Sequence, residues 1–437
     1  MHTFRTSALI VGLLVLPRLC AAQGLAASGV GPVNQSMAGA ATACPIDAAG
    51  ALMWNPASIS GLASSEVSLG FGLVFPQSTL SSRLDAGSFG PQVPPTPLAG
   101  ADASQSGTAA IPYLAFAEKI DNSCWTYGLG VFGIGGFRVN YPSSYSNPIL
   151  MPQPPDGFGL GHITSDVEIL QIAPTLSYAP TNRLSVGIAP TISLAKVGVD
   201  PVLFAPPDDA NGDGVPSYPE GRGSRSFWGG GFQCGVYYIA DGGWHFGAAV
   251  KTPQWFEDIR FYTVDEQGQS HTVKVAFTYP TVVSLGTAYS GLDDWILATD
   301  VRLFDFANAD GFRQTGFAPD GSLMGLGWSS IFAVSCGAQY QASEWLHLRL
   351  GYSYNQNPIS DFDSGFNVAS PGILQHFLYC GATIPLSCWT EFSAAYIHGF
   401  ENSVSGPIQT PAGAVPGSQV ASTAALDALS VGIAVKY

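Results

Sequence analysis

The last nine residues alternate strictly between two kinds of side chain. Every odd position from Leu429 to Tyr437 is bulky and apolar, whereas every even position is small or polar. The same pattern recurs at 125–131, 184–189 and 346–354. A period of two predicts an extended strand with two different faces. In a transmembrane barrel the bulky face would meet lipid and the other face the lumen, but a β-sandwich also alternates.

The tryptophans distinguish these two fold classes. Five of them sit just after short polar turns, at Trp125, Trp244, Trp295, Trp345 and Trp389. A ring of tryptophans at one end of successive hairpins is typical of a barrel at a membrane interface, whereas a sandwich would scatter them. The pattern therefore favours the barrel.

The number of turns predicts the number of strands. Adding the turn at 180–182 gives six short turns, and between them lie seven longer connections rich in Pro, Gly, Asn and Asp. These connections cover roughly residues 76–108, 140–164, 198–224, 254–272, 305–328, 355–375 and 401–425. Six short turns and seven long connections join 14 strands, an even number as barrels require. The sequence thus predicts an all-β fold, a 14-stranded antiparallel transmembrane β-barrel whose long loops lie outside the cell.

The N-terminus has the pattern of a secretory signal peptide. Arg5 precedes an apolar run from Ala8 to Leu16, and Cys20, Ala21 and Ala22 offer small residues at a cleavage site. We therefore expect residues 1–22 to be a signal peptide. Lipidation at Cys20 is the lesser alternative, because the preceding Leu19 is bulky.

The composition excludes some functions. Beyond the signal peptide no stretch offers about 18 consecutive apolar residues, so no membrane-spanning helix is expected. Only 11% of residues are charged, and the formal net charge of −15 argues against nucleic acid as a partner. Six cysteines remain after processing, without metal-ligand spacing. Cys380 and Cys388 flank a turn and are either free or paired, with the free state favoured.

Residues 23–62 differ from the alternating remainder. This stretch is rich in small residues and too irregular for a strand, and it leads directly into the first alternating segment after residue 63. A barrel of this size would leak unless its lumen were filled. We expect residues 23–62 to be a plug inside the lumen and residues 63–437 to be the barrel. A loose periplasmic tail is the alternative.

Three motifs resemble the FadL-type outer-membrane transporters of long-chain fatty acids and aromatic hydrocarbons. The first is Asn55-Pro56-Ala57-Ser58 followed by Ser60-Gly61-Leu62, which is similar to the end of that family's plug. The second comprises residues 348–359 with Pro371, Gly372 and His376, and the third is the segment 279–289. The resemblance implies a plugged 14-stranded barrel and supports assigning Asn55, Pro56 and Ala57 to the plug.

The resemblance also implies a transport route. The family has an inward kink in its third strand that opens the barrel wall, so that a hydrophobic substrate leaves sideways into the membrane. Here Gly133, Gly135 and Gly136 interrupt the alternation of the third strand. Glycine inside a strand marks a bulge or kink. We predict that these three glycines form the kink; the alternative is that they only make room for the plug.

The lumen separates a hydrophobic transporter from the alternatives. A general porin needs a charged constriction, whereas a carrier of apolar molecules needs inward apolar side chains. Parity places Phe132, Ile296 and Phe304 inside, beside few charges. This favours a gated outer-membrane transporter for hydrophobic small molecules such as long-chain fatty acids or aromatic hydrocarbons. A general porin, or a structural or adhesive barrel, is the alternative.

No catalytic motif is present. The chain lacks Gly-x-Ser-x-Gly, His-Glu-x-x-His, a Walker loop and a dinucleotide fingerprint. His347 or His376 beside a serine would be needed for an outer-membrane hydrolase, and a histidine hydrogen-bonded in the barrel wall is the simpler interpretation. We therefore expect no enzyme activity.

A carboxylate-bearing substrate would require a buried cation or several donors. By parity Asp300, Arg302 and Arg349 face the lumen. Arg302 and Arg349, together with Phe132 and Phe304, are therefore candidate ligand-binding residues. The alternative for Arg302 is a neighbour pair with Asp300.

The segment 209–220 fits the twelve-position calcium-loop pattern. Oxygen ligands fall at positions 1, 3, 5, 7 and 12, namely Asp209, Asn211, Asp213, the Val215 carbonyl and Glu220. No helices are expected beside the loop, and two prolines would distort its second half. Calcium in this extracellular loop is therefore one prediction, and a plain acidic surface loop is the other. No other cofactor is expected.

The expected location and partners follow from the fold. We predict a multi-pass barrel in the outer membrane of a Gram-negative-type bacterium, in contact with outer-membrane lipid and a hydrophobic small-molecule substrate. The terminal Tyr437 resembles the final aromatic residue that the barrel-assembly machinery recognises during biogenesis. No nucleic acid is expected.

Overall fold

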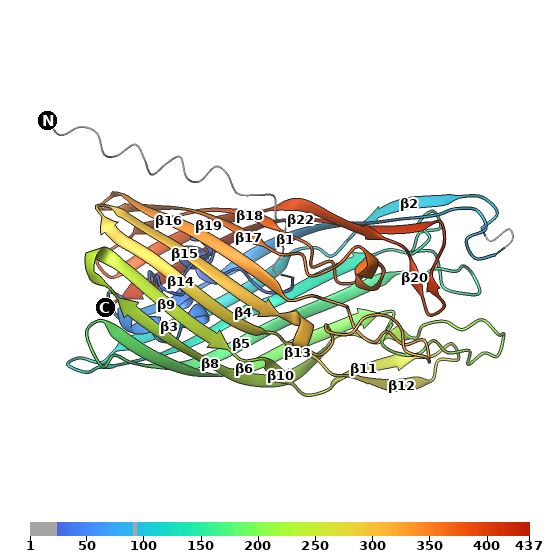
Figure 1. The fold of residues 1–437 in the computed structure, drawn as a ribbon, viewed down its shortest axis with the longest axis horizontal. Coiled ribbons are helices and arrows are strands. Elements are labelled where there is room, and N and C mark those ends of the chain that lie inside the picture. The colour runs from blue at the N-terminus through green and yellow to red at the C-terminus, as the bar shows by residue number, and fades with distance from the viewer. Residues whose placement is uncertain (1–23, 91–93) are drawn as a thin grey trace.

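The barrel wall is a single closed antiparallel sheet. The computed structural model describes residues 24–90 and 94–437, so the predicted signal peptide lies outside the described residues. Within these ranges fourteen long strands form the wall (Figure 1). They are β1 (Glu66–Leu84), β3 (Ala109–Lys119), β4 (Trp125–Tyr141), β5 (Ile163–Tyr178), β6 (Leu184–Asp200), β8 (Arg225–Ile239), β9 (Trp244–Lys251), β14 (Thr281–Leu292), β15 (Trp295–Asp305), β16 (Ile331–Ser343), β17 (Leu346–Asn355), β18 (His376–Pro385), β19 (Thr390–Gly406) and β22 (Ser418–Lys436).

The first and last strands close the ring. β1 pairs with β22 over its whole length, from Glu66 opposite Lys436 to Leu84 opposite Ser418. Every other neighbouring pair is also antiparallel. The predicted 14-stranded antiparallel barrel is confirmed.

The two faces of each strand differ as the alternation predicted. On β22, Leu429, Ile433 and Val435 are exposed on the outer surface, whereas Ser430 between them is buried in the lumen. The five turn-associated tryptophans are all exposed and lie at the short-turn end of the barrel. They form the girdle expected at the periplasmic membrane interface.

Several strands extend beyond the membrane band on the long-loop side. β1 reaches Leu84 and β19 reaches Gly406, whereas the sequence placed connections from about residue 76 and from about residue 401. The added residues are mostly small and polar and still pair with their neighbours. Alternation against lipid ends where the membrane ends, but the hydrogen-bonded ladder does not.

Smaller elements extend the wall and the loops. β2 (Leu98–Ala103) pairs with the upper part of β1, and β10 (Gln254–Phe256) and β13 (Thr278–Tyr279) prolong β9 and β14. Above the barrel, β7 (Glu220–Gly221), β11 (Ile259–Val264) and β12 (Ser270–Val275) form one small sheet, and β20 (Gln409–Thr410) and β21 (Gly413–Ala414) another. The short 3₁₀ helices η3 (Asp241–Gly243), η4 (Phe306–Asn308) and η5 (Phe362–Asn367) lie in the connections.

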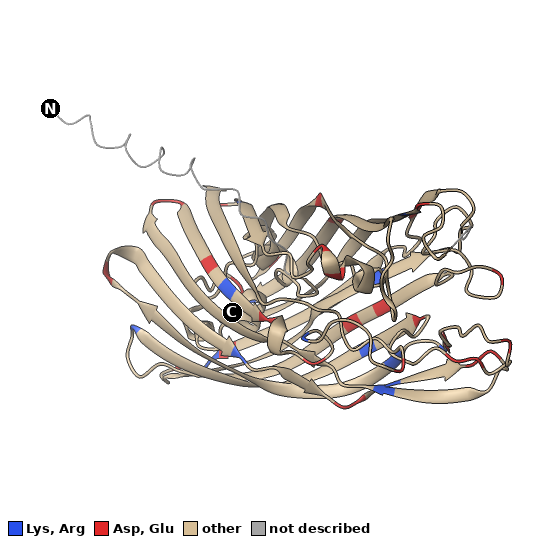
Figure 2. Ribbon diagram, turned by 45° about the vertical axis from the view of Figure 1, so that its right-hand side comes forward, with Lys and Arg blue, Asp and Glu red and all other residues tan. Residues whose placement is uncertain are grey.

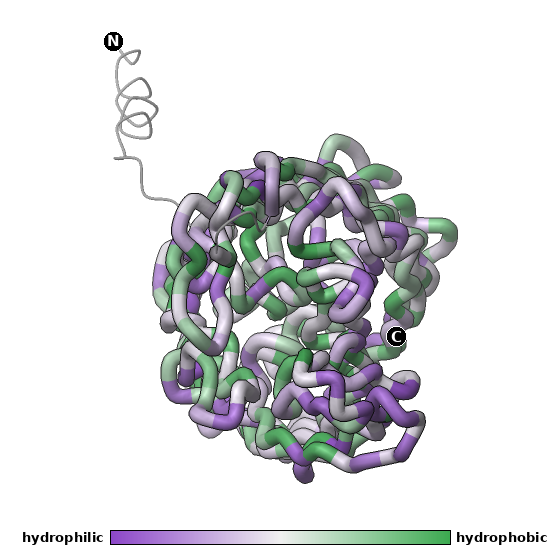
Figure 3. Tube along the Cα trace, turned by 90° about the vertical axis from the view of Figure 1, so that its right-hand side faces the viewer, coloured by the Kyte–Doolittle hydropathy of each residue, from purple (hydrophilic) through white to green (hydrophobic). Residues whose placement is uncertain are grey.

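Residues 24–62, called the plug below, lie inside the ring of strands (Figure 1), and the view from the end in Figure 3 shows that chain fills the ring. The plug contains α1 (Gly31–Ser36), α2 (Ala48–Trp54) and η2 (Ser58–Gly61). Glycines on the lumen face let its backbone approach the wall. A Cβ at Gly247 would lie 2.0 Å from the Thr42 carbonyl oxygen, and one at Gly187 would lie 2.4 Å from the Ala57 nitrogen. Lumen glycines are thus required where the plug touches the sheet.

An aromatic cluster covers the extracellular side of the plug. Phe304, Phe306, Phe312 and Trp328 are buried, and neighbouring rings in the cluster lie 4.8–6.4 Å apart between centroids. Charged residues are sparse along the strands, and many of the acidic ones occupy turns and loops at the two ends (Figure 2). No helix among the described residues is long and apolar enough to span a bilayer. The six cysteines at 44, 124, 234, 336, 380 and 388 are free.

Candidate functional site: the plug and the opening in the wall

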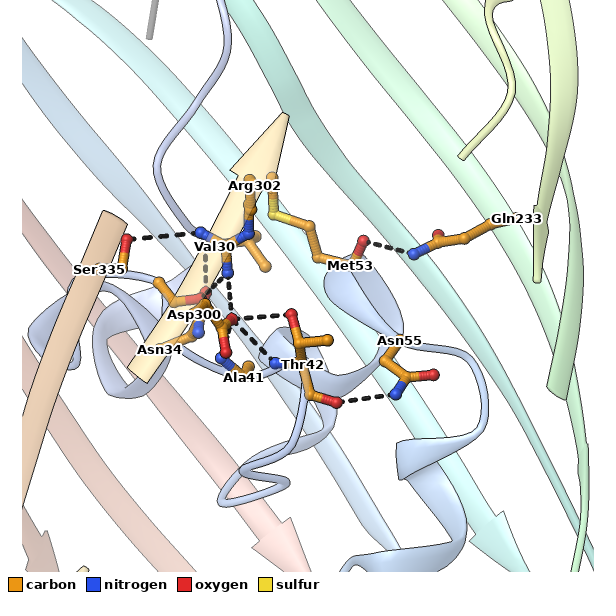
Figure 4. Close-up of polar contacts among 11 residues, drawn as sticks. Val30, Asn34, Ala41, Thr42, Met53, Asn55, Gln233, Asp300, Arg302 and Ser335 are labelled. Atoms are coloured by element: carbon orange, nitrogen blue, oxygen red, sulfur yellow. Dashed lines mark hydrogen bonds and ion pairs between the residues drawn. The ribbon is translucent and has the colours of Figure 1, made fainter. Parts of the chain in front are cut away.

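Asp300 on β15 fixes the middle of the plug. Its Oδ2 atom accepts hydrogen bonds from the backbone nitrogens of Ala41 and Thr42, both at 3.0 Å, and from the Thr42 hydroxyl at 2.8 Å (Figure 4). A buried carboxylate needs this number of donors to replace its hydration. The plug supplies all three, so Oδ2 has these donors only when the plug is docked.

Arg302, two residues along the same strand, completes the anchor. Its Nη2 atom donates to Asp300 Oδ2 at 2.5 Å and to the Gly39 carbonyl oxygen at 2.6 Å. The guanidinium carbon also lies 3.5 Å from the centre of the Trp54 ring. A desolvated contact of this kind contributes about 2 kcal/mol. The Asp300–Arg302 pair weighed from the sequence is therefore present, and both members bind the plug.

Asn55 of the plug motif connects the plug to itself and to the wall. Its side-chain nitrogen donates to the Thr42 carbonyl at 2.7 Å and to the Val236 carbonyl of β8 at 3.0 Å. Its side-chain oxygen accepts from the Ala57 nitrogen at 3.0 Å. Pro56 packs against Gly187, where no side chain intervenes. The three motif residues thus lie together against β6 and β8.

Asp47, just before α2, is buried at the periplasmic side of the plug. Burial, together with the charge of Glu66, raises the pKa of the Asp47 carboxyl to about 7, while Arg349 and Lys436 act against this shift. Glu66 also accepts a hydrogen bond from the Ala48 nitrogen at 3.2 Å. This part of the plug therefore favours the neutral form of Asp47 more than water does.

The barrel wall is interrupted between β3 and β4. These strands pair from Lys119 opposite Thr126 up to Tyr113 opposite Phe132, and no farther. Above that point residues 109–112 of β3 pair only with β1, and residues 133–141 of β4 pair along their length only with β5. The wall opens between these two edges.

A bulge in β4 begins at the same place. Gly133 pairs with Leu170 and Gly135 with Ile169, so Ile134 is an extra residue without a partner on β5. Ile134 is fully buried. The two consecutive residues Ile134 and Gly135 therefore both point inward, which turns the strand edge toward the lumen. The bulge lies within the glycine run that the sequence indicated.

The start of the plug, residues 24–30, called the arm below, lies along this inward edge. The Ala27 nitrogen donates to the Ile134 carbonyl, and the Gly136 nitrogen donates to the Leu25 carbonyl, both at 2.9 Å. Ala26 forms an antiparallel bridge with Gly135. A Cβ at Gly135 would lie 2.5 Å from the Leu25 carbonyl oxygen, so glycine is required for this approach.

A cavity of about 380 Å³ follows the opening. It is bounded inside by the arm, at the sides by β3 and β4, and farther out by parts of β1, β5 and β22. Its lining includes lumen-facing residues such as Ile169 and outward-facing residues such as Leu170 and Leu429. The cavity therefore links the plug with the outer surface of the barrel, and most of its lining is apolar.

The four ligand-binding residues proposed from the sequence do not line this cavity. Phe132 and Phe304 are buried in the apolar core beside the plug. Arg302 belongs to the anchor, and Arg349 donates to the Gln339 side-chain oxygen at 2.8 Å and to the Thr383 hydroxyl at 2.7 Å. Their role in ligand binding stays a prediction.

Lys251 was missed in the sequence, although parity from Trp244 places it in the lumen. The residue is buried, and its Nζ atom donates to the Gln171 side-chain oxygen at 2.9 Å. No carboxylate among the described residues lies within ion-pair distance of it. Gln254 joins the same network by accepting from Thr191 at 2.6 Å and Ser193 at 3.1 Å.

The predicted calcium loop is turned on itself. The Asp209 carboxylate accepts from the Gly214 nitrogen at 3.0 Å, and the Asp213 carboxylate accepts from the Val215 nitrogen at 2.8 Å. Glu220 lies on β7 and pairs with Arg222 at 3.1 Å. In the part of the chain that the structure describes, no group of three or more His, Cys, Asp or Glu residues is arranged to hold a metal ion.

Comparisons with known proteins agree with this architecture. The family model "Outer membrane protein transport protein (OMPP1/FadL/TodX)" matches residues 18–383. The solved structure of the Pseudomonas putida toluene transporter TodX is similar, with a TM-score of 0.68 and 16% identity over 94% of this chain and 99% of that one. A Pseudomonas aeruginosa FadL homologue gives a TM-score of 0.68 and 14% identity over 95% and 99%.

A third structure, the Ralstonia pickettii toluene transporter TbuX, gives a TM-score of 0.64 and 16% identity over 94% of this chain and 99% of that one. A search of curated proteins found no match. The family is one of outer-membrane channels for hydrophobic compounds and not of enzymes. The family match covers most of the chain and agrees with the closed barrel, so this chain belongs to the FadL/TodX family of outer-membrane transport proteins.

Proposed function

We propose that this protein takes up hydrophobic small molecules, such as long-chain fatty acids or aromatic hydrocarbons, and releases them sideways through the opening between β3 and β4. The observation that carries this proposal is the coincidence of three features at one place. Strand pairing ends at Tyr113 and Phe132, the bulge at Ile134 turns the edge inward, and an apolar cavity crosses the wall there. A polar pore would instead need a wet, charged lumen.

The route follows from the cost of transferring apolar surface into water. Moving a hydrophobic molecule into the aqueous periplasm would cost about 25 cal/mol of transfer free energy for each Å² of apolar surface exposed to water. Leaving through the wall keeps that surface in contact with protein and then with lipid. The arm lies between the rest of the plug and the opening, so its displacement would connect the lumen with the cavity.

A reversible lock across the opening tests this route. A Cβ at Gly133 would lie 2.8 Å from Cγ2 of Ile111, so cysteines at these two positions can approach to about the 3.5–4.5 Å between Cβ atoms that a disulfide requires. In a background with alanine at the native cysteines, we expect oxidised Ile111→Cys/Gly133→Cys to take up labelled toluene at least about tenfold more slowly, with recovery on reduction.

The two single-cysteine variants are the controls, because they carry the same substitutions without a cross-link. Mass spectrometry of the purified protein establishes that the disulfide has formed. If the cross-linked protein takes up toluene at the rate of its reduced form, lateral release at this opening is wrong.

We further propose calcium binding at Asp209, Asn211, Asp213, the Val215 carbonyl and Glu220. The support is the spacing of these oxygens and the exposure of the loop. Glu220 would have to release its ion pair with Arg222 in order to bind the calcium ion. Calorimetric titration of the purified barrel, repeated with Asp209→Ala/Asp213→Ala, should give heat only for the parent protein, at an affinity of about 10⁻⁴–10⁻³ M as in extracellular modules. Equal heats would remove calcium from the account.

A further inference from the structure

A tyrosine lies between the barrel wall and the plug at the periplasmic end of the cavity, called the floor below. Tyr113 is the uppermost residue of β3 that pairs with β4, so it stands where the opening begins. A Cβ at Gly70 would lie 2.8 Å from Tyr113 Cε1, and one at Gly432 would lie 2.1 Å from the Tyr113 hydroxyl oxygen. On the plug side, a Cβ at Gly31 would lie 3.0 Å from Cζ. The ring is thus held against bare backbone of β1, β22 and the plug, which fixes the position of its hydroxyl group.

Two further polar side chains lie at the floor. Tyr113, Ser430 of β22 and Gln35 of α1 all line the cavity. Ser430 lies two residues before Gly432 on the same face of the strand, a separation of about 7 Å. Gln35 lies four residues after Gly31 and so on the same side of α1. Since both glycines adjoin the Tyr113 ring, the three polar side chains lie close together.

These side chains have unused hydrogen-bonding groups. Tyr113 is 8% exposed and Ser430 is 3% exposed. In the described part of the chain, neither hydroxyl has a hydrogen-bond partner. Gln35 Nε2 donates to the Gly29 carbonyl oxygen at 3.4 Å, whereas the buried Oε1 atom has no partner. Buried polar groups are normally hydrogen-bonded, so this set indicates an occupant of the cavity with a polar group at the floor.

We propose that Tyr113, Ser430 and Gln35 form a subsite that binds the hydroxyl group of an uncharged aromatic alcohol, while the aromatic ring fills the apolar part of the cavity. This inference rests on the uptake function proposed above and narrows its substrate class. A hydroxyl group accepts a hydrogen bond from Tyr113 or Ser430 and donates its own proton to Gln35 Oε1. A methyl group of the same size does neither and leaves the buried groups unpaired.

The volume of the cavity suits such a molecule. An apolar cavity of about 150 Å³ holds one benzene molecule, and the cavity at the opening measures about 380 Å³. 2-Naphthol and 2-methylnaphthalene are matched probes, since they share a ring system and differ only in a hydroxyl or a methyl group. 2-Naphthol is uncharged at about pH 7, because phenolic hydroxyl groups ionise near pH 10. A water molecule displaced from the floor is replaced without loss by the hydroxyl group but not by the methyl group.

Equilibrium binding of the two fluorescent probes to the purified full-length protein in detergent tests the subsite, with protein-free micelles as the blank. The probes differ in their solubility in water, so each affinity is compared between the parent protein and a variant. In Tyr113→Phe we expect 2-naphthol to bind about threefold to tenfold more weakly, because one neutral hydrogen bond is lost. The affinity for 2-methylnaphthalene should change by less than about twofold.

The matched control is Tyr141→Phe, which makes the same substitution at a buried tyrosine of β4 outside the cavity lining. Both affinities should equal those of the parent protein. A second variant, Gln35→Leu, tests the acceptor and leaves the barrel wall intact if Tyr113→Phe fails to fold. It should weaken 2-naphthol about threefold and leave 2-methoxynaphthalene unchanged, because that probe has no proton to donate.

The outcomes separate the subsite from the exit. An unchanged affinity for 2-naphthol in Tyr113→Phe and Gln35→Leu, or equal weakening of 2-naphthol and 2-methylnaphthalene in Tyr113→Phe, overturns the subsite and leaves the exit standing. A parent protein that binds neither probe also overturns the subsite. The cross-link at Ile111 and Gly133 leaves all three side chains in place, so its lack of effect on uptake would overturn the exit alone.

Discussion

The plug is held at two places by interactions of different strength. At β15, Asp300 and Arg302 are almost completely buried and join three backbone groups of the plug with the Trp54 ring. At β4, the arm makes two backbone hydrogen bonds and no ion pair among the described residues, and its Leu25 and Val30 side chains are buried in the apolar core. Breaking a buried charged pair costs about 3–5 kcal/mol, whereas a neutral hydrogen bond contributes about 0.5–1.5 kcal/mol. Because the arm lacks a buried charged anchor, we expect it to leave the opening more readily than the middle of the plug leaves β15.

The largest effect on plug docking is expected at the Asp300–Arg302 anchor. Asp300→Ala leaves the Arg302 guanidinium buried without its carboxylate, and we expect plug docking to weaken by about 3–5 kcal/mol. Hydrogen exchange of residues 36–55, followed by mass spectrometry, measures this directly. Asp300→Leu/Arg302→Met removes both charges and should cost less. Protection in Asp300→Ala equal to that of the parent protein would show that this anchor does not hold the plug.

A smaller effect, dependent on pH, is expected at the periplasmic side of the plug. The pKa of Asp47 is about 7 in the folded protein against 3.8 for the unperturbed group, so ionisation opposes docking. Docking should be strongest below about pH 4 and should weaken as the pH rises from about 4 to about 7. Asp47→Asn should reduce this trend in the exchange of residues 44–55, corrected for the intrinsic pH dependence of exchange, because Glu66 remains as a second buried carboxylate beside it. An unchanged trend would exclude Asp47 as its source. A trend that persists in the variant must come from other groups.

The smallest effect on plug docking is expected where the arm contacts β4. Ala27→Pro removes the donor of the hydrogen bond to the Ile134 carbonyl, and we expect a loss of about 1 kcal/mol confined to the arm. Exchange of residues 24–30 should accelerate about fivefold, with residues 36–55 unchanged. Ala27→Gly keeps the donor and serves as the control. Acceleration that spreads to residues 36–55 would mean that the two ends of the plug are coupled.

The fold could be predicted from the sequence because contact with lipid requires alternating apolar and polar side chains along each strand. Alternation identifies the strands and the five tryptophans identify one membrane interface, and neither requires knowledge of which strand pairs with which. The extracellular extensions of β1, β19 and β22 carry no such pattern, since they lie beyond the lipid. The sequence therefore predicts these three strands several residues too short at their extracellular ends.

The sequence predicted parts of the site only where the residue type itself indicates a structural role. The glycine run at 133–136 marks a bulge because glycine weakens a strand for an identifiable reason. Parity also placed Asp300 and Arg302 in the lumen. The partners of Asp300 are backbone nitrogens of Ala41 and Thr42, and the partners of the arm are backbone groups of β4. Almost every residue type has the same backbone N–H and C=O groups, so these contacts could not be predicted from the sequence.

The seam between β1 and β22 has a consequence for the order of assembly. It joins β1, which begins four residues after the last residue of the plug, to β22, the last strand of the wall. The ring cannot close until β22 pairs with β1, and the plug residues precede both strands in the chain. Contacts so far apart in sequence form late. We therefore expect the barrel to be built around its plug rather than filled afterwards, with Asp300 and its neighbours serving as a template on which the late strands are arranged.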